Sequence, residues 1–333
     1  MVVGIIVGSG IFRTPGLVAA QLGRPWLTFV AWLLGAGLAL LGALVFAELA
    51  TRRPRAGGKY VFVMETFGRR AGFVVGWVEG LVIYLAAAGP AVIWTYYGYP
   101  EVAKIAEEVV DPNRTIPRAF VLGVAIVAAL YLSLNAAFLH VLPFETIAAS
   151  NLVAGDMAGV VFGARGGAIM AAIALLVVLA SLNGNVFATP RVLFGMARDG
   201  LAPALLVRVN RGGTPWTATL GVGLVGVALA ASGTFEWLLA LSITLVLAVD
   251  GLTALALFRY RASGTEAPFR TPWYPVTPAL FIAAYAALFV GAATASPGST
   301  GVAVLVLGGA YAASFTARRA ADETLPGTSA SKG

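Results

Sequence analysis

The chain has 333 residues, of which 59% are hydrophobic and 11% are charged, whereas a soluble domain carries about 25% charged residues. This composition excludes a soluble protein; the lack of cysteine excludes disulfides and thiol catalysis, and a single histidine, His140, excludes a histidine-rich metal cluster. The net charge of +7 lies in short loops between apolar runs, so it indicates membrane topology rather than nucleic-acid binding. We therefore expect an all-α, multi-pass protein of the inner (plasma) membrane, in contact with the lipid bilayer.

The first apolar segment is interrupted by Gly8-Ser9-Gly10, and we predict a broken helix over residues 1–12 and 14–22. Lipid cannot hydrogen-bond the backbone groups that such a break frees, so the break persists only where protein or a bound polar ligand satisfies them. The pattern fits a transporter binding site, and it also fits a glycine-rich packing face without a ligand.

Further spans follow in chain order, and together with the first they make about nine to ten membrane segments. They are expected near residues 26–50, 60–68 (short), 71–99, 118–142, 166–189, 215–232, 235–258, 272–295 and 300–317. Residues 1–319 are expected to form one transmembrane domain, and residues 320–333 are expected to form a disordered cytoplasmic tail.

Basic residues set the predicted orientation. The loops at 51–70, 104–118, 191–211 and 259–270, together with the C-terminal end from residue 318 on, hold 19 of the 22 lysines and arginines, which places them in the cytoplasm. Because the first two loops share a side, residues 71–103 must cross an even number of times. Two full crossings need about 40 residues. We therefore predict one span plus a half-helix, with a turn near Gly89-Pro90.

Four groups of residues, in order across residues 1–215, resemble motifs of the amino acid–polyamine–organocation (APC) transporter superfamily. They are Gly8-Ser9-Gly10-Ile11-Phe12 (first helix); Gly57-Gly58-Lys59-Tyr60-Val61-Phe62 with Gly76-Trp77 (second to third helix); Tyr96-Tyr97-Gly98-Tyr99 with Ile116-Pro117-Arg118-Ala119 (sixth helix and following loop); and Ser181-Leu182-Asn183 with Arg198-Asp199-Gly200 (eighth helix and following loop). The resemblance implies an amino acid permease with a LeuT-type inverted-repeat fold, broken first and sixth helices and no cofactor.

The chain departs from the twelve helices of this superfamily. The match passes from the third-helix pattern near residues 81–83 directly to the sixth-helix pattern near Trp94, so the fourth and fifth helices are expected to be absent. The first half-helix is also expected to be shortened. The chain is then either a truncated and internally deleted permease or a natural minimal variant.

In the resembled fold the substrate lies between the two broken helices. Helix N-termini attract a carboxylate, and exposed carbonyls attract an ammonium. By resemblance, the carboxylate is expected at Ser9, Gly10 and Ile11. The ammonium is expected at Val7 and Gly8, with carbonyls near Trp94, Thr95 and Tyr96. Tyr96, Tyr97 and Gly98 are expected to line the side-chain pocket or its gate, although these aromatic residues also fit an interfacial belt.

Several polar residues inside or beside spans are candidates for coupling or gating. Glu79 is expected either to have a functional role or to pair across helices or face a water-filled crevice. Asp250 is expected either to relay protons or contact a cationic substrate, or to face water in a vestibule. Asn183 fits either the site or a helix-to-helix hydrogen bond. Glu108, with Glu107 and Asp111, is expected to face Arg114 and Arg118 in a cytoplasmic gate or salt-bridge network. Glu48 is expected to pair with Arg52 or Arg53.

We interpret the chain as a secondary transporter that moves amino acids by alternating access, with coupling to H⁺, to Na⁺ or to amino acid exchange left open. The alternative is a non-transporting, degenerate or partner-binding membrane protein that retains part of the permease fold. We do not expect an enzyme or a metal site, because no nucleophile, metal-ligand set or acid–base histidine accompanies the carboxylates.

Overall fold

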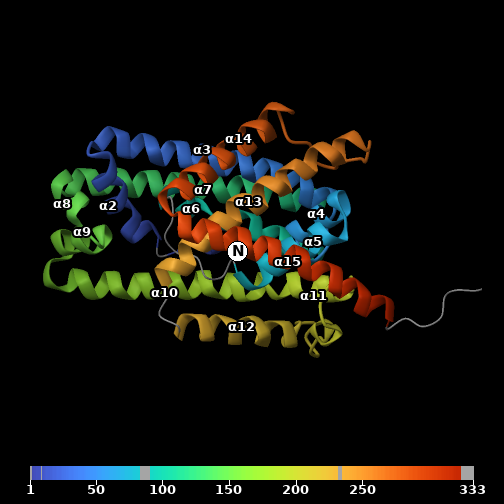
Figure 1. Cartoon of the computed structure of the whole chain (residues 1–333). Helices are drawn as coiled ribbons and strands as arrows, with labels where there is room; N and C mark the ends of the chain where they lie inside the picture. Colours follow the sequence, from blue (N-terminus) through green and yellow to red (C-terminus); the bar gives the residue numbers. More distant parts are fainter. Residues whose placement is uncertain (1, 9, 83–90, 232–234, 324–333) are drawn as a thin grey trace, which may run out of the picture.

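The computed structural model describes residues 2–8, 10–82, 91–231 and 235–323, and Figure 1 shows a bundle of helices through these parts of the chain. Six apolar stretches among them are long enough to cross a membrane, fewer than the nine to ten segments expected. Their main helices are α3 (Pro25–Arg52), α7 (Pro112–Val141), α10 (Gly166–Ala188), α13 (Phe235–Ala262), α14 (Val276–Ala295) and α15 (Pro297–Glu323). The predicted spans at 60–68 and 215–232, for example, form helices of 9 and 16 residues.

Shorter helices connect or interrupt these spans. They are α4 (Lys59–Phe67), α5 (Arg69–Trp77), the π-helix η1 (Val78–Val82), α8 (Phe144–Ala149), α9 (Val153–Phe162), η4 (Gly163–Arg165), α11 (Pro190–Arg198), η5 (Ala204–Val207) and α12 (Trp216–Ala231). The turn predicted near Gly89-Pro90 lies outside the described residues.

The first segment is broken, as predicted. Helix α1 (Val2–Ile6) ends before Gly8, and α2 (Gly10–Leu22) begins after it. The break lies upstream of the predicted boundary near residue 13, because Arg13-Thr14-Pro15-Gly16 continues α2 as a helix. Within α2, Gly16 lies against the carbonyls of Ile147 and Ser150, where there is no room for a Cβ atom.

A second break separates α6 (Ala91–Tyr96) from the 3₁₀-helix η3 (Tyr99–Glu108). Gly98 at this break has φ 126°, a backbone conformation that favours glycine. The sixth-helix pattern of the sequence therefore forms two short helices around a glycine, as the resemblance implied.

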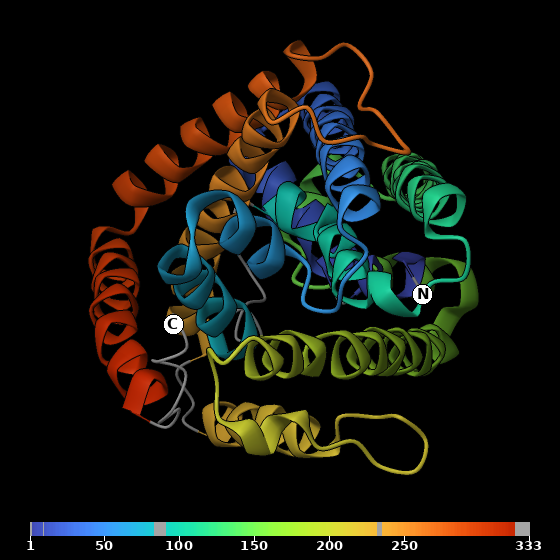
Figure 2. The ribbon, with the colours of Figure 1, turned by 90° about the vertical axis from the view of Figure 1, so that its right-hand side faces the viewer.

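The two breaks lie inside a ring of longer helices. Figure 2, which looks along the bundle, shows α14 and α15 on one side, α10 and α12 on another, and α3 and α7 on the third. Trp32, Tyr96 and Tyr131 form an aromatic cluster between α3, α6 and α7, with ring centroids 5.1–5.9 Å apart. The outer helices expose leucines, for example Leu175 and Leu176 of α10, as expected for helices that face lipid.

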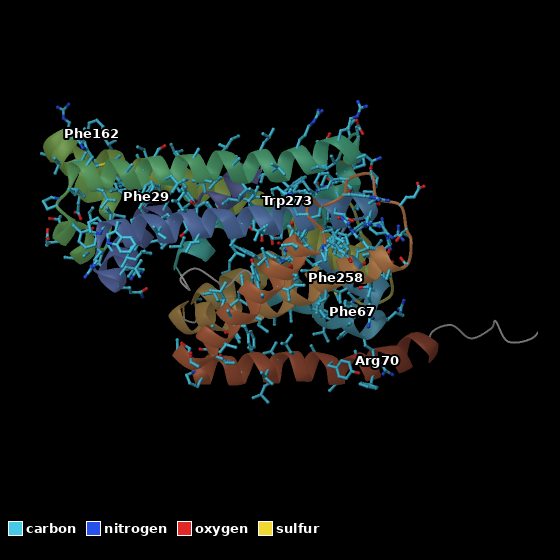
Figure 3. All side chains as sticks on the ribbon, turned by 90° about the horizontal axis from the view of Figure 1, so that it is seen from above. Phe29, Phe67, Arg70, Phe162, Phe258 and Trp273 are labelled. Carbon is cyan, nitrogen blue, oxygen red and sulfur yellow. The ribbon has the colours of Figure 1, made fainter. Side chains whose placement is uncertain are left out.

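The basic segments meet at one end of the bundle, as the charge distribution predicted. Figure 3 shows Phe67 and Arg70 toward this end and Phe29 and Phe162 toward the opposite end. Contacts join the segments to one another: Ala56 N–H to Glu107, Arg198 to Glu107, Arg52 to the Thr265 carbonyl, and Arg70 over the Phe315 ring. We call this part of the molecule the basic end.

Two details of the sequence analysis were wrong here. Lys59 and Lys104, counted among the loop cations, are fully buried. Helix α15 continues to Glu323, so residues 320–323 of the predicted disordered tail are helical, and residues 324–333 lie outside the described part of the chain.

Candidate functional site

The two helix breaks lie against each other. A Cβ atom on Gly98 would lie 3.1 Å from Ile6 Cα and 3.2 Å from the Ile5 carbonyl carbon, so this glycine lets the second break rest on the backbone of α1. A Cβ atom on Gly10 would lie 3.1 Å from Thr95 Oγ1. The structure therefore places Val7–Ile11 beside Thr95–Gly98, although Ser9 lies outside the described residues.

The carbonyl end of α1 points at hydroxyl groups from two other helices. Tyr131 of α7 donates a hydrogen bond to the Ile6 carbonyl at 3.3 Å, and Ser181 of α10 donates one to the Ile5 carbonyl at 3.3 Å. Helix α2 starts on the other side of the break, and the first N–H groups of a helix have no partner within it. The break thus presents carbonyls on one side and amide donors on the other.

The side chains around the second break differ in their surroundings. Thr95 Oγ1 contacts Thr14 Oγ1 at 3.1 Å, which joins α6 to α2. Tyr96 is buried in the aromatic cluster with Trp32, and Tyr97 accepts a hydrogen bond from Lys59 Nζ at 2.6 Å. The Trp94 backbone lies in α6, and its side chain is outside the described part. Tyr96 therefore packs between α3, α6 and α7, and its expected role at the substrate pocket or gate stays a prediction.

The coupling candidates separate into buried and exposed residues. Glu79 and Asp250 are fully buried, and both contact Lys59 Nζ, at 2.8 Å and 2.6 Å. Of the alternatives for Glu79, the structure shows pairing across helices. The vestibule alternative for Asp250 was wrong, because this carboxylate has no exposed surface. Asn183 is exposed on α10, whereas its neighbour Gly184 packs against Ile5 of the first break.

The acidic residues at the end of η3 do not face the expected partners. Glu107 pairs with Arg198 at 2.8 Å and Glu108 pairs with Arg191 at 2.6 Å, both on α11. Arg114 reaches only Asp111, at 4.0 Å on the surface. The expectation that Glu107 and Glu108 face Arg114 and Arg118 was wrong, because the left-handed turn at Asp111 (φ 49°) starts α7 in another direction.

This pairing predicts a charge-swap result at the basic end. Arg198 is the main cause that lowers the pKa of Glu107 below 4.5, so the pair is fully present above that pH and is lost as the pH falls through the lowered pKa. We expect Glu107→Arg to loosen the contact between η3 and α11, and Glu107→Arg with Arg198→Glu to restore it. Hydrogen–deuterium exchange of residues 190–200 measures how tightly α11 is held, and it should be faster in Glu107→Arg than in the double variant. Equal exchange in the single and the double variant would contradict the pairing.

Sequence reasoning missed the role of Lys59. This lysine follows Gly57 and Gly58, whose φ angles of 117° and 58° turn the chain, and it precedes the apolar run Tyr60-Val61-Phe62. A lysine that begins an apolar helix after a glycine pair was the available signal for burial. We assigned Lys59 to a cytoplasmic loop instead, because the arginines before it suggested a basic loop.

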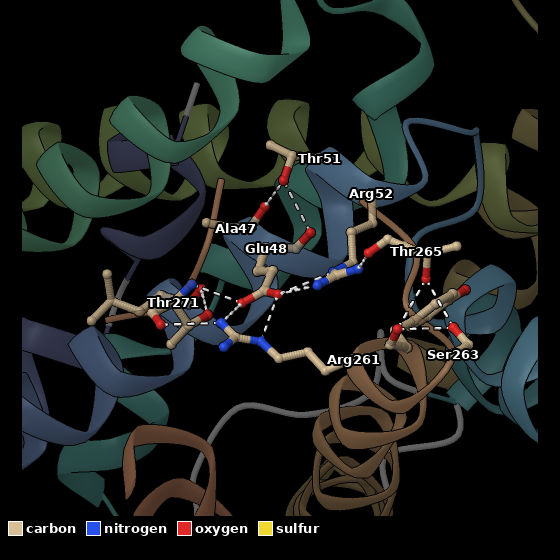
Figure 4. Close-up of polar contacts among 10 residues, drawn as sticks. Ala47, Glu48, Thr51, Arg52, Arg261, Ser263, Thr265 and Thr271 are labelled. Atoms are coloured by element: carbon tan, nitrogen blue, oxygen red, sulfur yellow. Dashed lines mark hydrogen bonds and ion pairs between the residues drawn. The ribbon is translucent and has the colours of Figure 1, made fainter. Parts of the chain in front are cut away.

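A second buried network surrounds Glu48 of α3 (Figure 4). Its carboxylate accepts hydrogen bonds from Arg52 at 2.7 and 3.0 Å, from Arg261 at 2.6 and 3.0 Å, and from the Thr271 backbone N–H at 2.7 Å. The expected pairing with Arg52 is confirmed. Arg261 and Thr271 were not predicted, and through them Glu48 ties α13 and the segment after it to α3.

The comparisons with known proteins agree with this architecture. The sequence model of the amino acid permease family matches residues 1–89 and 79–311 of the chain, in two segments that meet where we expected the fourth and fifth helices to be missing. The serine/threonine exchanger SteT of Bacillus subtilis is 26% identical over 381 positions, covering 85% of this chain and 86% of the relative.

Two further relatives come from mammals. The cystine/glutamate transporter of Homo sapiens is 26% identical over 417 positions, covering 92% of this chain and 81% of that protein. The Asc-type amino acid transporter 1 of Mus musculus is 22% identical and is covered to 77%. Both alignments are longer than the 333 residues of the chain, so they leave gaps in it, in agreement with its shortened length. The chain belongs to the amino acid permease family.

Proposed function

We propose that this amino acid transporter binds its substrate between the breaks of α1–α2 and α6–η3 and moves it by alternating access. The observation that carries the proposal is the direct contact of the two breaks, Gly98 on the backbone of Ile5 and Ile6, and Gly10 on Thr95. The amide end of α2 suits the carboxylate of an amino acid, and the carbonyl end of α1 suits its ammonium group. The basic end faces the cytoplasm under the positive-inside rule.

The charges near the breaks favour a neutral amino acid. The carboxylates that would attract a cationic side chain, Glu79 and Asp250, already contact Lys59. The described residues of the two breaks carry no ionised side chain. Among the relatives, one is named as a serine/threonine exchanger. We therefore propose small neutral amino acids as substrates and exchange as the mode of transport.

The alternative of a non-transporting protein gains no support from the relatives, which are named as transporters and exchangers. The test of transport is uptake of labelled amino acids by proteoliposomes that contain the purified chain, with and without unlabelled amino acid inside. Faster uptake into preloaded vesicles is the expected result for an exchanger. Folded, inserted protein without saturable uptake would overturn the proposed function.

Gly10→Leu is the variant that probes the site. The new side chain would enter the space next to Thr95, so we expect loss of amino acid binding with membrane insertion unchanged. Gly221→Leu on α12 is the matched control, since nothing lies within 4 Å of a Cβ atom there. The measurement is binding of labelled serine to the purified proteins. Equal binding by wild type and Gly10→Leu would show that the first break is not the site.

A further inference from the structure

A second group of polar residues lies next to the breaks, and all of its members except Tyr97 lie outside the proposed substrate site. We call it the buried charge cluster; it consists of Lys59 (α4), Glu79 (η1), Tyr97 (between α6 and η3), Glu101 and Lys104 (η3) and Asp250 (α13). Each of these side chains is at most 9% exposed. The cluster therefore joins four separate parts of the bundle through charges without access to water.

Lys59 is at the centre of the cluster. Its Nζ lies 2.8 Å from Glu79 Oε1 and 2.6 Å from Asp250 Oδ1, and it donates a hydrogen bond to the Tyr97 hydroxyl at 2.6 Å. An ammonium group has three N–H donors, and here three partners surround it. Lys59 thus contacts two carboxylates at once, and its single positive charge is shared between them.

The second lysine does not balance the remaining carboxylate. Lys104 Nζ lies 2.6 Å from Glu101 Oε2, and 3.8 Å from Glu79 Oε1. Three carboxylates therefore face two ammonium groups. Among the residues that the structure describes, the other titratable groups at the cluster are the phenols of Tyr97, Tyr99 and Tyr285, which are neutral when protonated. The Phe46 ring of α3 lies 5.9 Å from Lys59 Nζ.

A net charge of −1 in a buried site is costly, and such sites bind a proton instead of staying ionised. Two carboxylate oxygens of the cluster are free to bind such a proton. Glu79 Oε2 and Asp250 Oδ2 are both buried, and neither has a hydrogen-bond partner among the described residues. These two carboxylates share Lys59 Nζ as a partner, so a proton held on either of them lies at the same point of the cluster.

We propose that the buried charge cluster is a proton-binding site, which holds one proton on the Glu79–Asp250 pair. Tyr97 and Lys104 belong to the broken segment, whereas Lys59, Glu79 and Asp250 belong to α4, η1 and α13. A movement of α6–η3 changes the partners of the two carboxylates and with them their affinity for the proton. By linkage, the proton then biases the position of α6–η3. This link to transport rests on the proposed function, and the proton site itself does not.

Infrared spectroscopy of the purified protein tests the site without transport. We expect the wild type to show the carbonyl band of a protonated carboxylic acid, which titrates with pH. Asp250→Asn and Glu79→Gln each make the cluster electrically balanced, so each should remove the band. Glu145→Gln, an exposed glutamate of α8, is the control that keeps it. A wild type without this band at every pH where it is folded, or a band that persists in both cluster variants, would overturn the proposal.

Proteoliposomes test the link to transport. Serine uptake by the wild type and by Glu145→Gln should respond to a pH gradient. Asp250→Asn should still exchange serine in the same vesicles, but its uptake should no longer respond to the gradient. Uptake that follows a Na⁺ gradient and ignores pH would overturn the link. A wild type that transports no amino acid would contradict the proposed function, and the infrared result would still decide the proton site.

Discussion

Lys59→Met is expected to destabilise the protein more than any other single change at the buried charge cluster. It leaves three carboxylates with one ammonium group, Lys104, in a site that water does not reach. Breaking a buried ion pair by removing one partner costs about 3–5 kcal/mol, and Lys59 has three partners. The measurement is the midpoint of thermal unfolding of the protein in detergent.

Two further variants separate charge from shape. Lys59→Met combined with Asp250→Asn has the same net charge in the cluster as the wild type, so we expect part of the stability to return. Arg114→Met is the control, because this side chain is 79% exposed and a surface pair contributes about 0–1 kcal/mol. A Lys59→Met protein that unfolds at the wild-type temperature would show that the carboxylates do not depend on Lys59.

Glu48→Ala is the second change with a large expected effect. It removes the acceptor of five hydrogen bonds and leaves two arginines, with side chains 2% and 18% exposed, without their carboxylate. We expect a loss of about 3–5 kcal/mol, and faster proteolysis of residues 263–275, which Glu48 holds through Thr271. Unfolding midpoints and limited digestion measure the two effects.

The matched controls come from the same network and the same segment. Glu48→Gln keeps the shape and one carbonyl oxygen, so its loss should be smaller than that of Glu48→Ala. Glu266→Ala removes an exposed carboxylate from the loop between α13 and α14, and it should change neither the unfolding midpoint nor the rate of digestion. Equal digestion of Glu48→Ala and wild type would contradict the role of Glu48 as an anchor.

The spans could be predicted because an apolar length alone decides them. The predicted spans at 26–50 and 235–258 correspond to α3 (Pro25–Arg52) and α13 (Phe235–Ala262). The same holds for the LeuT-type fold, which membership in the family now supports, and for the first break, where Gly8-Ser9-Gly10 interrupts an apolar run. Each of these signals lies within a short stretch of the sequence, so it can be recognised without knowledge of the three-dimensional contacts.

The ion pairs could not be predicted, because their partners lie far apart in the chain. Lys59 pairs with Asp250, and Glu107 pairs with Arg198. We expected Arg114 and Arg118 as partners of Glu107, because they lie close to it in the sequence. Turns with positive φ angles lie beside both sets of charges, at Gly57 and Gly58 before Lys59 and at Asp111 after η3. The substrate roles of Val7–Ile11 and Thr95–Gly98 remain a prediction, although the two stretches lie together.

The ion pair between Arg261 and Glu48 fixes one end of α13 to α3, so this contact is a pivot about which α13 can tilt. Arg261 is fixed to α3 near the basic end, and Asp250 lies about 16 Å farther along the same helix at 1.5 Å per residue. A tilt of α13 by about 5° around this pivot displaces Asp250 by about 1.4 Å. Because Asp250 lies 2.6 Å from Lys59 Nζ, a displacement of this size directed away from the lysine would stretch the pair to about 4 Å, the outer limit of an ion pair. The pivot at Arg261 and the buried ion pair of Asp250 thus lie on one helix, so a small tilt of α13 would act on the length of one buried ionic contact.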